Sequence, residues 1–157
     1  MPRTVAAESA PTGLNVRLVV LEAPALLAEQ RNSRKKGDAG LGAAIAFFTA
    51  RGDTVSVPLT DSQEYDLIVD EDGVLKKVQV KATTRSRKGA FEVWLRGNGG
   101  GCRSNNYTMK PFDWHEIDYV FVLCGDGSQW FIPADELEHN ATSVSVGGGR
   151  REHLRVA

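Results

Sequence analysis

Cysteine is scarce in this chain of 157 residues, which has only Cys102 and Cys124. The two lie in unlike contexts, and the sequence has no Cys-x-x-Cys pair. It therefore predicts neither a zinc site nor a disulfide framework. Such sparing use of cysteine is typical of a reducing compartment, and we expect the protein to be cytoplasmic.

Long apolar runs are also missing. The best candidate, near the N-terminus, is interrupted by Arg17 and Glu22, so we expect neither a signal peptide nor a membrane span. The sequence has no internal repeat. Its length suits one domain with its own core, and we expect an N-terminal arm or extension (residues 1–34), the domain itself (35–140) and a C-terminal tail (141–157).

A strong net charge is absent as well, because 19 basic residues nearly balance 20 acidic ones. The balance hides an asymmetry: residues 76–110 hold nine lysines or arginines and one acid, Glu92. Residues 53–72 hold seven acids and no base, and residues 111–140 also lack a base. A basic segment between acidic ones suits metal-binding carboxylates beside a phosphate-binding surface. The alternative is a set of solvated faces.

The apolar pattern predicts a mixed α/β domain around one central sheet. Leu41, Ala44, Ile45 and Phe48 share one face of a helix over residues 38–50, which ends before Gly52. Asp38 would lie in its first turn, after a basic linker at residues 31–36. We expect strands at residues 54–59, 90–95, 119–123 and 129–132, a polar loop at 96–112 and a short helix at 133–138.

The most informative stretch is residues 64–82, where two β-rich runs flank Asp72-Gly73. Asp-Gly favours a type I′ hairpin turn, because both central residues need positive φ. With Glu71 facing Val74, Asp66 lies opposite Gln79 and shares a face with Lys81. The opposite face carries an apolar set suited to burial: Leu67, Val69, Val78 and Val80.

This hairpin resembles the active-site hairpin of the PD-(D/E)xK nuclease superfamily. The family pattern is an Asp on one strand and (Asp/Glu)-x-Lys on the next, and here it reads Asp66, then Gln79-Val80-Lys81. Gln in place of the second acid is the variant associated with homing endonucleases of group I introns. The resemblance covers roughly residues 35–137 and implies a restriction endonuclease-like core, with a central mixed sheet flanked by helices.

The resemblance also implies a metal site for phosphodiester hydrolysis. Asp66 would be the hard oxygen ligand of Mg²⁺, with Mn²⁺ as a possible substitute. Gln79 would add an amide oxygen, and the Val80 carbonyl is the usual third ligand of the family. Lys81 would position the attacking water or stabilise the transition state. The alternative is a surface hairpin with a Lys–Asp pair and an exposed glutamine.

One departure from the family concerns the first helix, where many relatives carry a Glu. Here Leu41 follows Gly37-Asp38-Ala39-Gly40, and a leucine cannot bind a metal. Asp38, about one turn earlier, is one substitute. Glu64 is another, because it shares the parity of Asp66, although it could equally be an ion-pair partner of Lys81. The site thus has less negative charge than usual, so its metal affinity should be lower.

Double-stranded DNA is the expected partner, bound mainly through phosphate contacts. The candidates are Lys76, Arg85, Arg87, Lys88, Arg103, Asn105 and Lys110. Asn105 lies in a loop with residue types that read base edges, although a plain polar loop is equally consistent.

Three functions remain open. The leading one is a Mg²⁺-dependent DNA endonuclease of the homing type, which would act as a homodimer or homotetramer because cutting both strands needs two centres. A structure-selective junction nuclease of the same superfamily is the second. The third is a DNA-binding module whose site is degenerate.

Overall fold

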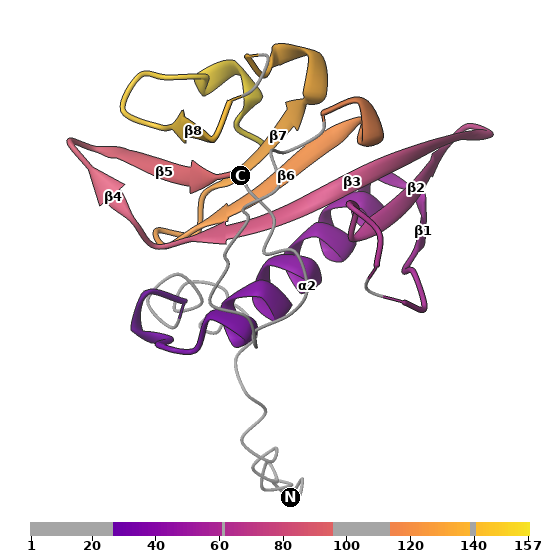
Figure 1. The fold of residues 1–157 in the computed structure, drawn as a ribbon, viewed down its shortest axis with the longest axis horizontal. Coiled ribbons are helices and arrows are strands. Elements are labelled where there is room, and N and C mark those ends of the chain that lie inside the picture. The colour runs from indigo at the N-terminus through magenta and orange to yellow at the C-terminus, as the bar shows by residue number, and fades with distance from the viewer. Residues whose placement is uncertain (1–26, 61, 96–113, 139–140) are drawn as a thin grey trace, which may run out of the picture.

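The computed structural model describes residues 27–60, 62–95, 114–138 and 141–157. The main helix is α2 (Ser33–Arg51), and the strands are β1 (Thr54–Ser56), β2 (Leu67–Glu71), β3 (Val74–Thr83), β4 (Ser86–Arg87), β5 (Ala90–Trp94), β6 (Tyr119–Cys124), β7 (Gln129–Pro133) and β8 (Ser143–Val146). Short 3-10 helices follow at η1 (Trp114–Glu116), η2 (Ala134–Glu136) and η3 (Glu152–Leu154). Figure 1 shows three layers: α2, the sheet that contains β3, and a smaller sheet that contains β5 and β8.

Helix α2 starts earlier than the apolar pattern predicts. The Asn32 side chain caps it by accepting hydrogen bonds from the N–H groups of Arg34 and Lys35, at 3.0 and 3.4 Å. The expected linker at residues 31–36 was therefore wrong, since most of it is helical, and Asp38 does not lie in the first turn. The C-terminus is confirmed, because Gly52 ends the helix with a φ of 98°.

The central sheet has five strands in the order β1-β2-β3-β6-β7, and β3 pairs with β6 in parallel while the other pairs are antiparallel. The β2–β3 hairpin has the predicted turn, with φ of 52° at Asp72 and 89° at Gly73. Its register is also confirmed, because Glu71 pairs with Val74. A one-residue slip would have turned every side chain to the other face.

One face of this sheet packs against α2. The buried residues of that layer are Ala44, Phe48, Leu67, Val69, Val78 and Phe121. Gly40 lets the helix approach β3 closely, because a Cβ at this position would lie 3.2 Å from the Ala82 Cβ and 3.3 Å from the Val80 Cγ1. The helix is therefore seated directly against the half of β3 that carries Gln79 and Lys81.

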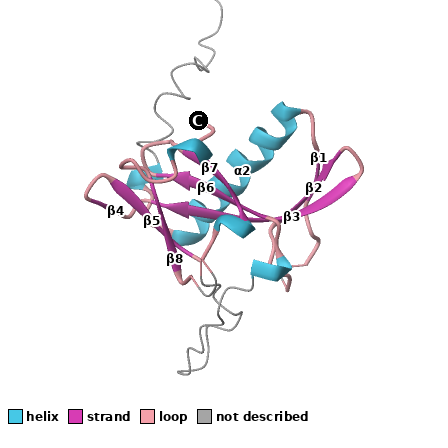
Figure 2. Cartoon of the chain, turned by 90° about the horizontal axis from the view of Figure 1, so that it is seen from above, coloured by secondary structure: helices cyan, strands magenta, loops and turns pink. Residues whose placement is uncertain are grey.

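The opposite face of the sheet is partly core as well. Val120 and Val122 of β6 are buried there, under the antiparallel sheet β4-β5-β8. Figure 2 shows that the small sheet and the β1–β2 pair lie at opposite ends of the molecule. The small sheet thus covers only one end of this face of the central sheet. Buried apolar residues lie under it, and polar residues lie on the uncovered part.

Several segments differ from the sequence-based expectation. The strand expected over residues 54–59 stops at Ser56. Residues 141–157, expected to be a tail, contain β8, which pairs with β5 and contributes Val144 and Val146 to the core. The helix expected at 133–138 is the shorter η2. Within the described ranges, no helix is long and apolar enough to cross a membrane.

Candidate active site

Asp66 lies immediately before β2, where that strand separates from β3. Its N–H still donates to the Val78 carbonyl, at 2.9 Å. Its carboxylate Oδ2 then accepts the N–H of Val80 at 2.7 Å, in place of a main-chain partner. The same oxygen accepts a hydrogen bond from Nε2 of Gln79. The predicted proximity of Asp66 and Gln79 is therefore present, and two donors hold the carboxylate in place.

The Val80 carbonyl shares the edge of β3 to which Asp66 is bound. In a strand, the N–H and C=O of one residue point to the same side, and the Val80 N–H points to Asp66. A carboxylate and a carbonyl oxygen therefore lie along one strand edge, next to a side-chain amide. Oxygen donors of these types are the ligands that Mg²⁺ prefers.

Lys81 is two residues beyond Gln79 and shares its face of β3. The side chain is partly buried. Burial lowers the pKa of the Lys81 ammonium below its usual value, and the Asp66 and Glu64 carboxylates oppose that shift. The structure therefore brings together Asp66, Gln79, Lys81 and the main chain of Val80, with the exposed Glu64 at the margin.

The position of the family's helix acid is apolar in this chain. Leu41 packs against the core between α2 and the sheet, as expected for a residue that cannot bind a metal. Asp38 is exposed on α2. The described part of the chain has no group of three or more His, Cys, Asp or Glu side chains placed to hold a metal. A metal at this site would therefore depend on Asp66, neutral oxygen donors and at most one further carboxylate, Glu64.

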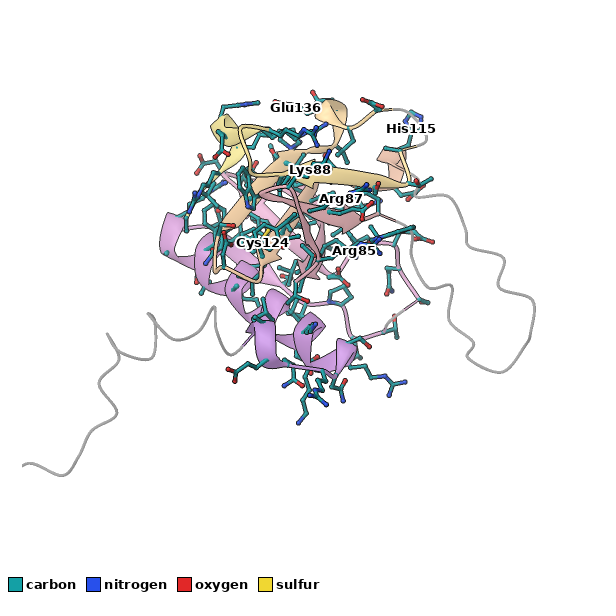
Figure 3. All side chains as sticks on the ribbon, turned by 90° about the vertical axis from the view of Figure 1, so that its left-hand side faces the viewer. Arg85, Arg87, Lys88, His115, Cys124 and Glu136 are labelled. Carbon is teal, nitrogen blue, oxygen red and sulfur yellow. The ribbon has the colours of Figure 1, made fainter. Side chains whose placement is uncertain are left out.

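Cys124 offers no alternative nucleophile. It is fully buried, and burial raises the pKa of its thiol to about 11, so the reactive thiolate is disfavoured at neutral pH. The thiol is labelled in Figure 3. Its partner in the parallel ladder is Thr83, the last residue of β3.

The proposed DNA contacts fall into different environments. Lys76 pairs across the hairpin with the buried Val69, so it lies on the α2 face, opposite Lys81. Its ammonium is 3.3 Å from the Asp118 carboxylate. The structure therefore does not bring Lys76 to the active-site face.

Arg85, Arg87 and Lys88 lie together at the β4–β5 hairpin (Figure 3). Arg85 pairs with Glu92 at 2.9 Å, whereas Arg87 and Lys88 are exposed. Arg103, Asn105 and Lys110 lie outside the described residues.

Lys36 is a neighbour of the site that the sequence analysis did not single out. Its Nζ donates to the Thr84 hydroxyl at 2.8 Å, just past the end of β3. The spacing carries a weak signal for this contact, because Lys36 precedes Gly40 by four residues and so lies on the same helix face. The apolar pattern predicts a linker at Lys36, because the Asn32 cap precedes the first apolar residue of the helix.

Comparison with known proteins gives a consistent result. The family model for PD-(D/E)XK endonucleases matches residues 31–156. Among solved structures, a bacterial homing endonuclease, I-Ssp6803I, is similar with a TM-score of 0.65 and 26% sequence identity, over 77% of this chain and 82% of that chain. No curated protein sequence matches. The fold is thus a restriction endonuclease-like mixed α/β fold, as the hairpin resemblance predicted.

Proposed function

Since this chain belongs to the PD-(D/E)XK endonuclease family, we propose that it hydrolyses phosphodiester bonds of double-stranded DNA with Mg²⁺ bound at Asp66. One observation carries the proposal. The Asp66 carboxylate is fixed by the Val80 N–H and the Gln79 amide, on the strand edge that also presents the Val80 carbonyl.

Asp66, the Val80 carbonyl and Gln79 are the groups that would hold the metal, which Mn²⁺ could replace. When bound, the ion supplies charge stabilisation at the phosphate and an acidified water. Gln79 donates to Asp66 through Nε2, so only its Oε1 is left to bind a cation. Its first role in the protein is to orient Asp66. Glu64 is the remaining candidate ligand.

Lys81 would orient the attacking water or stabilise the charge that develops on the phosphate. The lowered pKa of Lys81 suits this role. An ammonium with a lower pKa loses its proton more easily and so exchanges protons with water more readily. The Asp66 and Glu64 carboxylates attract the ammonium and oppose part of this lowering of its pKa.

The likeness to a bacterial homing endonuclease supports a site-specific homing type of activity for this chain. Cutting both strands needs two centres, so the active form would be a homodimer or homotetramer. The chain has few cysteines, which supports a location in a reducing compartment such as the cytoplasm.

Nicking of supercoiled plasmid with Mg²⁺ or Mn²⁺ tests the proposal, beside calorimetric titration of Mg²⁺. Asp66→Ala should abolish both nicking and Mg²⁺ binding, because it removes the one fixed carboxylate. Asp70→Ala is the matched control. The Asp70 carboxylate accepts the Gly73 N–H at 2.6 Å in the hairpin turn. The variant should therefore lose stability but keep the parent nicking rate at low temperature.

Gln79→Glu extends the same experiment. A second carboxylate beside Asp66 should lower the Mg²⁺ concentration needed for half-maximal binding, by about tenfold for each 1.4 kcal/mol gained. The rate need not rise, because tighter ground-state binding does not stabilise the transition state. Plasmid cleavage by Asp66→Ala at the parent rate would refute the assignment. A parent that binds DNA but never nicks it would instead be a DNA-binding module, and preference for four-way junctions would indicate a junction nuclease.

A further inference from the structure

Two glycine turns of the small sheet pack directly on each other. The β4–β5 turn has positive φ at Lys88 (51°) and Gly89 (78°), and the turn after β8 has positive φ at Gly148 (61°). A Cβ on Gly148 would lie 3.1 Å from the carbonyl carbon and oxygen of Gly89. The approach therefore requires glycine, and it brings the chain around Arg150 next to the chain around Lys88.

The two turns at this corner of the small sheet carry three basic residues. Arg87, Lys88 and Arg150 are all exposed. No ion pair between described residues involves any of the three. Arg87 and Arg150 lie on opposite sides of the β5–β8 pair, and the Glu152 carboxylate in the second turn accepts the Gly149 N–H at 3.1 Å. These exposed cations are therefore available to an anionic partner.

The outer face of the same sheet carries an exposed aromatic residue. Val93 and Leu95 of the β5 segment point into the core, so Trp94 points outward and is 45% exposed. The Arg85 guanidinium lies over its ring, 5.8 Å from the centroid. Exposed aromatic rings among arginines are typical of surfaces that contact nucleic acid.

The corner is coupled to the candidate active site through β3. Thr83, the last residue of β3, donates its hydroxyl to the Glu92 carbonyl of β5 at 2.8 Å. Arg87 follows Lys81 by six residues, so the two Cα atoms are at most about 20 Å apart. One turn of duplex DNA is about 34 Å long, so the corner and the site can contact one DNA segment.

We propose that Arg87, Lys88 and Arg150 form a phosphate-binding corner that holds the backbone of duplex DNA close to the bond to be cut. The inference rests on the proposed function, because it names where that substrate is held. Arg87 and Lys88 lie at the β4–β5 turn and Arg150 at the turn after β8, so all three lie at one end of the sheet β4-β5-β8. Arg85 contributes less, because Glu92 already neutralises it.

Fluorescence anisotropy of a labelled linear duplex, in EDTA and from about 50 to about 200 mM salt, tests the corner without cleavage. Arg87→Gln with Lys88→Gln, and separately Arg150→Gln, should each weaken binding. For every phosphate that a variant no longer neutralises, the slope of log K against log salt should fall by about 0.9, and binding should weaken by up to about tenfold near 0.1 M salt. Arg87→Lys and Arg150→Lys should restore both values.

The matched control is Lys77→Gln, which removes an exposed cation at the other end of β3 that pairs with Glu116. It should leave affinity and slope near those of the parent. An equal weakening in this control would mean that net charge alone drives binding, and parental values in the corner variants would mean that the corner does not contact DNA. Either result overturns the inference.

Plasmid nicking separates this inference from the proposed function. If the corner variants lose affinity while the parent protein never nicks DNA, the corner stands and the endonuclease proposal fails. If the parent nicks DNA and the corner variants bind with parental affinity, the endonuclease proposal stands and the corner proposal fails.

Discussion

The two ends of strand β3 carry similar basic residues in different electrostatic environments. At the Val74 end, Lys76 lies 3.3 Å from Asp118, and Lys77 lies 3.5 Å from Glu116. Past the Thr83 end, Arg87 and Lys88 form no ion pair with any described residue. The candidate active-site residues Asp66, Gln79 and Lys81 lie between these ends.

The basic segment over residues 76–110 therefore contains two groups of cations, one paired with acids and one without ion pairs among the described residues. Cations at the Val74 end neutralise acids of the η1–β6 segment and so help to hold that segment against the hairpin. Cations past the Thr83 end have no such task and remain available to a polyanion. A charge count along the sequence cannot separate the two groups, because the neutralising acids come from a distant part of the chain.

The largest effect on stability is expected at the Val74 end. Asp118→Ala removes the partner of the Lys76 ammonium and also the acceptor of the Lys77 N–H, at 2.8 Å. We expect the free energy of unfolding to fall by about 1.5–3 kcal/mol, as for hydrogen bonds to charged groups. Urea denaturation gives the value. DNA affinity should not decrease, and a decrease would contradict the structural role assigned to this end.

A smaller effect on stability is expected where α2 packs against the Thr83 half of β3. Gly42→Ala should raise the free energy of unfolding by about 0.5–1 kcal/mol, because nothing lies within 4 Å of its Cβ position and alanine favours the helix. Gly40→Ala should lack this gain, because its Cβ meets Val80 and Ala82 at 3.2–3.3 Å. Thermal melts of the two variants measure the contrast. Equal gains would show that the helix can move away from β3 at no cost.

The effect that is smallest at neutral pH is a pH dependence at the Thr83 end, which develops only in alkaline solution. The Cys124 thiol has a pKa of about 11 when folded, compared with about 8.5 when unfolded. Between these values the folded state binds more protons, so the free energy of unfolding should fall as pH rises through the window. Cys124→Ala should remove this fall. The slope difference between parent and variant, from denaturation at several pH values, isolates the thiol from other titrating groups. Identical slopes would mean that the thiol is accessible.

Much of the hairpin could be predicted because its signals are local. Asp72-Gly73 selects a type I′ turn, and that turn sets the register that places Asp66 beside Gln79. The period-2 pattern then assigns Leu67, Val69 and Val78 to the buried face. The end of helix α2 is also a local feature, because Gly52 adopts a positive φ. These features depend on neighbouring residues, and the backbone has few alternatives there.

Strand β8 and the corner around Gly148 could not be predicted in this way. Ser143–Val146 is short and polar at alternate positions, and it becomes a strand only because β5, some fifty residues earlier, offers a free edge. The contact of Gly148 with Gly89 likewise depends on that pairing.

The turn, the register and the shared face of Asp66, Gln79 and Lys81 follow from local sequence, because backbone preferences and side-chain alternation set them. Only the tertiary structure decided which cations are neutralised, why Lys76 lies apart from Lys81, and how the Val80 N–H came to bind the Asp66 carboxylate. Those outcomes depend on where β2 leaves β3 and on which distant segments pack nearby. Long-range packing sets them, and a local pattern does not encode it.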